Sequence, residues 1–571
     1  MQRKKINRKH LRLNISFACL FACFCLLFFR LAYIQILKHG ELSYQAKEQH
    51  LKLTKVRMPR GTIFDRNGKE MAVSLAAKSV YGVPSEIKDP SEIAWKLSSV
   101  LSTEASELQN KFSAKNSFCW IERKIDLKKA KDVQDLNLKG IGLLNDSRRA
   151  YPQSSMACHV IGFVGVDDEG LEGVELNCDR KLRGRDGSEV LSMDAKGQLV
   201  ISSVQKYTPP EGGLDVCLTI DQTIQYIAEE ELESAWKKYH AKAGMVIVLR
   251  PETGEILAMA NRPNFDLNNY RDYSAEERRN RTITDIFEPG STFKIISGAA
   301  ALESGVRESD KVFCENGCYQ LEKRKIRDHE KHGWLTFRQV IAYSSNIGMA
   351  KISARIPREK IYDMARAFGF GNPTRIDLPG EGKGLLRHPH EWSEFSTASI
   401  AYGQEVGVTA IQLAAAFAAV ANNGVLMKPY IVKCIKDKDE ILEENKPEKI
   451  RQVIPQETAR QLISLMEDVV SYGTATSVSI PGVKAAGKTG TAQKTDPVTH
   501  KYSADRYTAS FIGMVPSTKP RLVILVIVDE PKGCQWGGVI CGPVFSNIGK
   551  RVLHYLDYRM ETGQLAQAGE K

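Results

Sequence analysis

The sequence predicts an α+β fold: an apolar helix near the N-terminus, a mixed domain after it, and a larger domain built on one antiparallel sheet. Three observations support this prediction. Residues 15–29 are apolar or small without interruption. Strand-like segments fall into two groups, at 244–261 and 483–529, and the sequence between them is mostly helical. Strands placed before and after a helical insertion are typical of an antiparallel sheet with helices packed beside it.

Composition and charge limit the functions open to this chain. Its 571 residues are too many for one compact domain. Of the net charge of +12, six charges lie in the first twelve residues, which contain no acidic residue. The rest of the chain has only a modest basic excess and no interleaving of arginines with aromatics, so nucleic acid is not expected as a partner. The basic N-terminus instead indicates contact with anionic lipid head groups.

Residues 13–37 are predicted to cross a membrane as one helix, since the apolar stretch has about the length that a bilayer requires. The basic residues before it predict that residues 1–12 form a cytoplasmic tail. A cleaved signal peptide is the alternative, but no small-x-small cleavage site follows the stretch. A lipid-modified Cys23 fits less well, because apolar residues continue after it. The remainder is expected outside the cytoplasm, on the periplasmic or extracytoplasmic side.

Residues 38–215 are predicted to form an extended, mixed pedestal domain. The segment 91–135 is rich in Lys and Glu with amphipathic spacing, which predicts helix. No nucleophile-plus-base grouping stands out here, so the region is expected to act as a spacer or docking module. A Pro/Gly-rich linker at 208–213 ends it.

Residues 216–558 are predicted to form the second domain, and 559–571 a polar, flexible tail. A helix at 221–239 precedes a β-hairpin that turns at 251–254. Three more strands are expected near the end, the last of them fully buried because 521–529 is almost continuously apolar. A closing amphipathic helix is expected at 544–558.

Three short motifs carry the candidate chemistry, and the first is S-x-x-K at 291–294. Residues three apart on a helix share a face, so Lys294 should lie beside Ser291. A serine hydroxyl becomes nucleophilic when a base accepts its proton. A lysine can be that base if burial and positive charge, here from a helix N-terminus and Lys488, lower its pKa. The motif alone is weak evidence, because S-x-x-K also begins at Ser85 and Ser203.

The second and third motifs are S-S-N at 344–346 and K-T-G-T at 488–491. Taken alone, the former is a helix cap or turn and the latter an ordinary edge strand. Together with Ser291, they indicate one acyl-transfer site, since S-x-x-K, S-D-N and K-T-G form a known motif set. Ser344 would then relay a proton to the leaving amine, and Asn346 would bind the peptide backbone.

With these motifs in place, the chain resembles the class B penicillin-binding proteins, peptidoglycan D,D-transpeptidases of the serine β-lactamase-like fold. The resemblance extends over nearly the whole chain. It includes R-G…D-R-N-G at 60–68, R-A-Y-P at 149–152, G-L-E-G-V-E at 170–175, R-N-R at 279–281, Y-G-Q at 402–404 and T-A-I-Q-L at 409–413. Glu288 before P-G-S, and Q-W-G-G at 535–538, resemble the division-specific, FtsI-like branch. One departure is Glu405, where the family usually has a small residue.

The resemblance implies a mechanism and a set of site residues. The implied catalytic residues are Ser291, Lys294, Ser344 and Lys488, and the implied substrate-binding residues are Asn346, Thr489, Gly490 and Thr491. The backbone N–H groups of Ser291 and Thr491 would form the oxyanion hole. No metal or cofactor is implied. The implied partners are nascent peptidoglycan strands, β-lactams, the membrane, a lipid-linked-precursor polymerase and other division proteins.

Three alternatives to a division enzyme stay open. An elongation-type enzyme of the lateral wall shares every motif. A D,D-carboxypeptidase or β-lactamase would use water to resolve the acyl-enzyme, although neither requires a pedestal or an anchor. A scaffold or β-lactam sensor would have kept the fold without the activity, which the intact motifs disfavour.

Cysteines and histidines offer weaker signals. Disulfides Cys314–Cys318 and Cys534–Cys541 are compatible with an oxidising compartment, and unpaired cysteines are an equal alternative. The segments 388–391 and 329–332 contain two histidines each, without the H-E-x-x-H spacing of a zinc helix. They are interpreted as solvated loops rather than metal sites.

Overall fold

The computed structural model describes residues 8–43, 51–56, 58–113, 118–193, 199–209, 211–496 and 501–569. The chain divides into two units, one of residues 1–58 with 184–212 and the other of residues 59–183 with 213–571. The second unit contains all three motifs.

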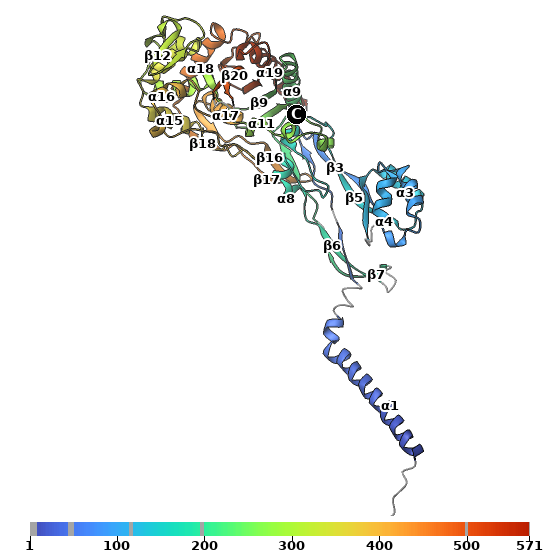
Figure 1. The fold of residues 1–571 in the computed structure, drawn as a ribbon. Helices are drawn as coiled ribbons and strands as arrows, with labels where there is room; N and C mark the ends of the chain where they lie inside the picture. Colours follow the sequence, from blue (N-terminus) through green and yellow to red (C-terminus); the bar gives the residue numbers. More distant parts are fainter. Residues whose placement is uncertain are drawn as a thin grey trace, which may run out of the picture. The chain divides into compact units, whose positions relative to one another are not determined.

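A five-stranded antiparallel sheet forms the centre of the second unit (Figure 1). Its order is β10 (Ile256–Arg262), β9 (Ala243–Leu249), β21 (Leu522–Asp529), β20 (Tyr502–Val515) and β19 (Ala486–Thr495). The prediction of two early and three late strands in one sheet is confirmed. Every residue of β9 and all but the last of β21 are buried, which explains their continuous apolar sequence: a strand covered on both faces has no polar side.

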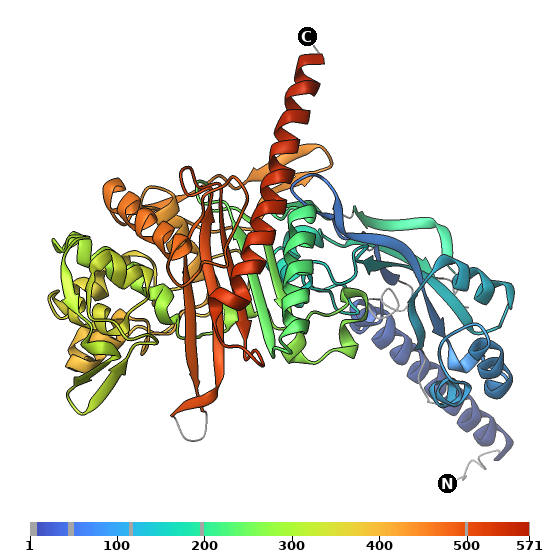
Figure 2. The same ribbon diagram turned by 90° about the horizontal axis from the view of Figure 1, so that it is seen from above.

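Helices cover both faces of this sheet (Figure 2). On one face lie α9 (Gln222–Lys238) and α19 (Gly537–Gly569), and on the other lies α17 (Ala410–Ala421). α17 is buried along its whole length, as its alanine-rich sequence without charges allows. α19 runs past the predicted end at 558 to Gly569, so residues 559–569 are helical where the polar sequence predicts a loose tail.

The helical insertion between the two groups of strands carries two of the motifs. Its helices include α12 (Lys294–Glu303), α13 (Phe337–Ala342), α14 (Asn346–Ser353), α15 (Arg358–Ala367), α16 (Glu394–Ala401) and α18 (Gln456–Ser471). α12 contacts α14 and α18, and α18 in turn contacts β19. These contacts bring the S-x-x-K and S-S-N segments to the edge of the sheet that carries K-T-G-T.

A seven-stranded sheet joins sequence from both sides of the predicted domain boundary at 215/216. Its order is β17 (Glu440–Glu444), β16 (Val432–Asp437), β8 (Asp215–Leu218), β2 (Ile63–Phe64), β3 (Glu70–Gly82) and β4 (Cys119–Ile125), and β5 (Ile141–Ala150) also pairs with β3. β8 pairs with β2 on one side and β16 on the other. The boundary predicted at 215/216 therefore falls within β8, a strand of this sheet. The other predicted domain limits remain predictions.

The prediction of helix throughout 91–135 is wrong at β4. Helices α3 (Pro90–Ser98), α4 (Ala105–Ser113) and α5 (Leu127–Asp135) surround this strand. β4 pairs with β3 and buries Ile121 and Ile125. Pairing with a distant strand thus overrides the Lys- and Glu-rich composition, as strand formation depends strongly on context.

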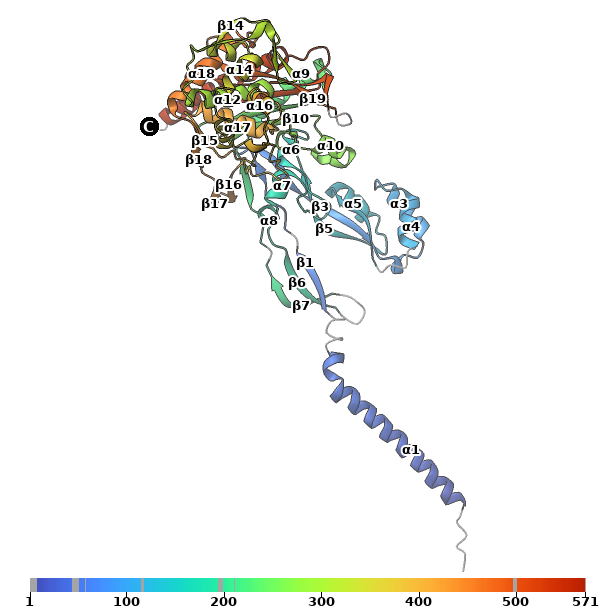
Figure 3. The ribbon, with the colours of Figure 1, turned by 60° about the vertical axis from the view of Figure 1, so that its left-hand side comes forward.

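The first unit contains the apolar helix and a three-stranded antiparallel sheet. α1 (Arg8–Ala32) continues as a π-helical segment, Tyr33–Leu37. Residues 10–37 make the one helix in the described chain that is long and apolar enough to cross a membrane, a candidate anchor. β1 (Leu51–Val56), β6 (Gly187–Met193) and β7 (Leu199–Thr208) form the sheet (Figure 3). Arg3, Lys4 and Lys5 of the predicted cytoplasmic tail lie outside the described residues.

Candidate active site

Ser291 lies in a tight turn that leads into α12. The turn is a 3₁₀ segment, Gly290–Phe293, so Ser291 comes just before the α-helix rather than within it. The Gly290 N–H donates to the Gly403 carbonyl at 3.0 Å. Gly403 has φ +86°, and a Cβ there would lie 1.9 Å from the Gly290 carbonyl oxygen. Only glycine at 403 allows this close approach, which holds the turn of the nucleophile in place.

Lys294 is fully buried and points toward the second motif. Its Nζ donates to the Ser344 carbonyl at 2.5 Å, to Asn346 Oδ1 at 2.8 Å and to Ser344 Oγ at 3.3 Å. None of these three hydrogen bonds goes to Ser291. The first two motifs are thus joined through the lysine amine.

Ser344 connects all three motifs. Its Oγ accepts a hydrogen bond from Lys488 Nζ at 2.8 Å as well as the one from Lys294. Its backbone has φ +59°, an uncommon conformation for a residue with a side chain. Such strain is often found at functional sites, where the surrounding structure enforces it.

Burial governs the electrostatics of the two lysines. Burial lowers the pKa of Lys294 from 10.5 to about 7, and the nearby charge of Asp328 opposes this shift. Burial, and then the charge of Lys294, also hold the pKa of Lys488 well below its usual value. Desolvation penalises an ammonium, and two ammonium groups close together penalise each other. Near neutral pH, a substantial fraction of Lys294 is therefore uncharged.

Asp328 holds the second motif in position. Its Oδ1 accepts the backbone N–H groups of Asn346 at 2.6 Å and Ile347 at 3.0 Å. Its Oδ2 accepts the Ser345 hydroxyl at 2.5 Å. Ser345 also caps α14 through the N–H of Gly348 at 2.8 Å. The carboxylate thus fixes the start of α14, from which Asn346 projects. Nothing in the local sequence around Asp328 indicates this role.

The third motif lies on β19, the edge strand of the five-stranded sheet. A Cβ at Gly490 would lie 2.3 Å from Ser510 Oγ and 3.1 Å from the Pro289 carbonyl oxygen. The turn before Ser291 therefore packs closely against the strand. Thr489 Oγ1 lies 2.7 Å from Thr474 Oγ1, a partner that the sequence does not reveal. Thr491 Oγ1 accepts the Gly537 N–H at 3.3 Å.

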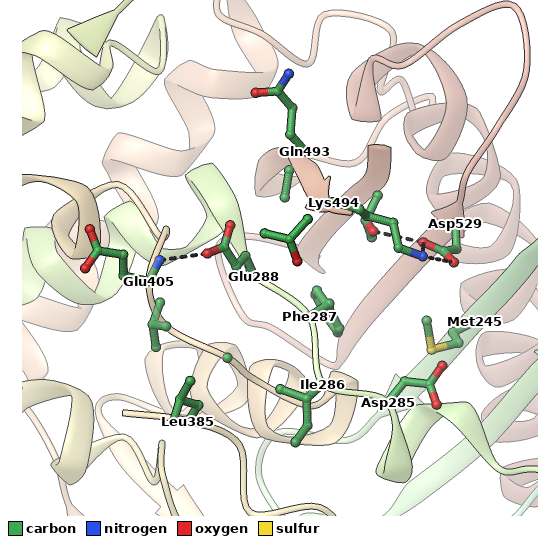
Figure 4. A pocket seen from close by; sticks show the side chains of 15 residues that line it. Met245, Asp285, Ile286, Phe287, Glu288, Leu385, Glu405, Gln493, Lys494 and Asp529 are labelled. Carbon is green, nitrogen blue, oxygen red and sulfur yellow. Dashed lines mark hydrogen bonds and ion pairs between the residues drawn. The ribbon is translucent and has the colours of Figure 1, made fainter. Parts of the chain in front are cut away.

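A cavity of about 310 Å³ lies behind the nucleophile turn, between Glu288, Glu405 and β19 (Figure 4). Glu288 accepts the Glu405 N–H at 2.8 Å and the Tyr502 hydroxyl at 3.1 Å. Burial raises the pKa of Glu288. Glu405, the departure from the family pattern, accepts hydrogen bonds from Ser396 at 2.9 Å and Ser399 at 2.5 Å and pairs with Arg387. Its carboxylate is satisfied by residues of the helical insertion.

The remaining sequence candidates make no hydrogen bond to Ser291, Lys294 or Lys488 among the described residues, although Cys314 accepts one from the Ser345 hydroxyl. His388 and His390 face each other with their Nδ1 atoms 2.7 Å apart. The His329 ring packs against Trp536 with ring centroids 4.0 Å apart. The cysteines at 314, 318, 534 and 541 are free thiols.

Comparisons with known proteins agree with this architecture. Residues 244–550 match the penicillin binding protein transpeptidase domain, and residues 55–218 match the penicillin-binding protein dimerisation domain. The chain is 36% identical to Stage V sporulation protein D of Bacillus subtilis, over 98% of this chain and 88% of the relative. It is 31% identical to the peptidoglycan D,D-transpeptidase FtsI of Escherichia coli, over 96% and 92%. The crystal structure of penicillin binding protein 3 from Mycobacterium tuberculosis with aztreonam has a TM-score of 0.68 at 27% identity, covering 88% of this chain and 97% of that one.

The three motifs meet where the helical insertion packs against the edge strand of the five-stranded sheet, and with the matching domains they define a serine acyltransferase of penicillin-binding type. The chain belongs to the class B penicillin-binding proteins, which carry a dimerisation domain before the transpeptidase domain. It is therefore an enzyme, a transpeptidase of peptidoglycan synthesis.

Proposed function

We propose that this protein cross-links peptidoglycan stem peptides through an acyl-enzyme formed on Ser291. The observation that carries this proposal is the convergence of two buried lysines on the Ser344 hydroxyl. One of these lysines follows Ser291 by three residues. Such an arrangement is suited to moving protons between a nucleophile and a leaving group.

Lys294 is the base for acylation. A neutral amine has two N–H bonds and one lone pair. The N–H bonds can donate to the Ser344 carbonyl and Asn346 Oδ1, the two shortest contacts of Nζ. The lone pair takes the third position, toward Ser344 Oγ at 3.3 Å, the longest of the three contacts. We expect it to turn to the Ser291 hydroxyl and accept its proton when the substrate binds. A pKa of about 7 suits this task, because a base is most effective when its pKa lies near the working pH.

The reaction proceeds in two steps. In the first, Ser291 Oγ bonds to the carbonyl carbon between two terminal D-alanines and the C–N bond breaks. The proton from Ser291 passes through Lys294 and Ser344 to the departing amine. In the second, an amine of a neighbouring stem attacks the acyl carbon, the ester bond breaks, and the serine regains a proton. Lys488 keeps the Ser344 hydroxyl oriented throughout.

The edge of β19 binds the donor peptide. Half of the backbone groups of an edge strand face away from its partner strand, so a peptide can lie beside them. Thr489 and Thr491 offer hydroxyl donors for the terminal carboxylate, and the amine of Lys488 lies beside Thr489 Oγ1 at 3.5 Å. Gly490 keeps the strand close to the turn of Ser291. Asn346 binds the peptide backbone, and the N–H groups of Ser291 and Thr491 hold the oxyanion.

The setting of the reaction follows from the candidate anchor and the relatives. We place the N-terminus in the cytoplasm and the catalytic domain outside it, by the positive-inside rule. A role at the division septum is supported by relatives named FtsI and by Glu288 before Ser291. The expected partners are a lipid-linked-precursor polymerase and other division proteins.

Labelling of cells with a fluorescent penicillin tests the proposal. The wild-type protein should be labelled and Ser291→Ala should not, and wild-type signal should gather at midcell. A signal spread along the lateral wall would favour the elongation role. Purified wild-type protein should keep the adduct for many minutes, whereas rapid release of the penicilloyl group would favour a hydrolase. Loss of cross-linking in Ser291→Ala would exclude a sensor without activity.

A further inference from the structure

We propose that a basic pocket beside Asn346 binds a second carboxylate of the donor stem peptide, on a residue that precedes the two terminal alanines. This inference rests on the proposed function and extends it to substrate selection. The pocket has a volume of about 810 Å³. We define the basic pocket by four of its lining residues: Arg324, Lys325, Arg327 and Arg387.

The basic pocket is attached directly to the catalytic site. β13 (Arg324–Arg327) pairs with β12 (Cys318–Leu321) and supplies three of its cations. Asn346, which also lines the pocket, donates from Nδ2 to the Arg327 carbonyl at 3.1 Å. Asp328, the next residue, holds the Asn346 N–H. The cations of β13 are thus held in register with the residue that is proposed to bind the donor backbone.

The opposite wall of the pocket continues the strand that binds the donor peptide. Gln493 lies two residues after Thr491 on β19 and lines the pocket. Residues two apart on a strand point to the same side. A peptide that lies along β19 and passes Asn346 therefore reaches the basic pocket with the part that precedes its terminal alanines.

The charges of the pocket favour an anion. Four basic and two acidic side chains line it. The acidic Glu405 is already bound by Arg387 and two serines. In the described parts of the chain, Arg324, Lys325 and Arg327 have no ion pair. Arg324 lies over the Phe395 ring, 4.6 Å from its centroid. Such stacking orients a guanidinium and leaves its N–H groups free for a ligand.

A carboxylate is the anion that fits both the pocket and the reaction. A guanidinium presents paired N–H groups that match the two oxygens of a carboxylate. The terminal carboxylate of the donor is assigned to the threonines of β19 and to Lys488. Asn346 and Gln493 line the basic pocket, whereas Lys488, Thr489 and Thr491 are not among its lining residues. A different carboxylate, on an upstream residue, must therefore occupy it.

Two penicillins that differ at one group test this inference. Both carry the same acyl side chain, which ends in a carboxylate in one and in the carboxamide in the other. The second-order rate of acylation is measured on the full-length protein in detergent. The wild type should react about tenfold faster with the carboxylate, as expected for one charge-assisted hydrogen bond. Added salt should reduce this ratio, because the cations are exposed.

Variants of the hairpin provide the control. Arg324→Ala and Arg327→Ala should each bring the ratio of the two rates toward one. Lys323→Ala removes a charge from the same hairpin outside the pocket, and should leave the ratio at its wild-type value. Equal rates of the wild type with both penicillins would overturn the inference, as would an unchanged ratio in both arginine variants. If neither penicillin acylated the wild type, the proposed function would fail and the inference with it.

Discussion

Lys294 and Lys488, both fully buried, donate hydrogen bonds to one and the same hydroxyl, Ser344 Oγ, at 3.3 and 2.8 Å. Two desolvated ammonium groups this close repel each other, so the free energy is high when both amines are protonated. Burial lowers the pKa of Lys294 to about 7, and burial together with the charge of Lys294 lowers that of Lys488. An amine that can accept a proton near neutral pH is the result. This relationship underlies the first two predictions.

The rate of acylation should depend on the protonation of Lys294. Because its pKa is lowered to about 7, the amine is charged and inactive below that pH and neutral above it. The rate should rise with pH through about 7 and then level off. Lys294→Arg, which stays charged, should lose about 10²- to 10⁴-fold on the plateau above pH 7 and progressively less below it. Fluorescent-penicillin kinetics across pH measure this, and a rate independent of pH between 5 and 9 would contradict it.

Asp328→Asn should shift this profile. The negative charge of Asp328 raises the pKa of Lys294, so removing the charge lowers that pKa further. The midpoint of the acid limb should therefore move to lower pH. Glu330→Gln, which neutralises an exposed carboxylate two residues away, is the control and should leave the midpoint in place. If Asp328→Asn lowered the plateau but kept the midpoint, Asp328 would have a structural role only.

Gly403→Ala should displace the turn of the nucleophile. The new Cβ would meet the Gly290 carbonyl oxygen at 1.9 Å, whereas at Gly305 no atom lies within 4 Å. Both glycines have positive φ, so Gly305→Ala controls for backbone strain. Acylation should fall by about 100-fold in Gly403→Ala, because a small misplacement of reacting groups is costly. Gly305→Ala should retain the wild-type rate, and equal rates in the two variants would contradict the role of this contact.

Glu175→Ala should destabilise the region where several family motifs meet. The buried carboxylate of Glu175 pairs with Arg60 at 2.9 Å and Arg149 at 2.7 Å. Its removal leaves the buried guanidinium of Arg149 without its carboxylate partner and Arg60 with Asp179 alone, at 2.6 Å, at a cost of about 3–5 kcal/mol in the free energy of unfolding. Glu92→Ala breaks an exposed pair with Lys96 and should change stability little. Urea unfolding of the two variants provides the comparison.

The sequence predicted the central sheet well, since its signals are local. β21 is apolar almost throughout, and β9 and β10 flank a recognisable turn. β4 was missed because its pairing with β3 spans a long stretch of chain that no local pattern records. For the same reason, the position of β8 between β2 and β16 could not be foreseen.

In the candidate site too, the residues with a local sequence signal were predicted and those without one were missed. The three motifs supplied Ser291, Lys294, Ser344 and Lys488, because each motif has a recognisable spacing. Asp328 and Thr474 were not found, since a single aspartate or threonine in a loop has no distinguishing neighbours. The contact of Asp328 with Asn346 forms inside the folded insertion, and that of Thr474 with Thr489 forms when the insertion packs against β19. The sequence predicted that Lys294 lies beside Ser291, whereas the hydrogen bonds of its amine in the structure go to Ser344 and Asn346.

Mass spectrometry of the penicillin-treated protein tests the central claim most directly. After proteolysis, the penicilloyl mass should be found on the peptide that contains Ser291, and fragmentation should place it on that serine. The adduct should be absent from Ser291→Ala. An adduct on another residue, or no adduct on the folded wild-type protein, would contradict the claim that a neutral Lys294 activates Ser291.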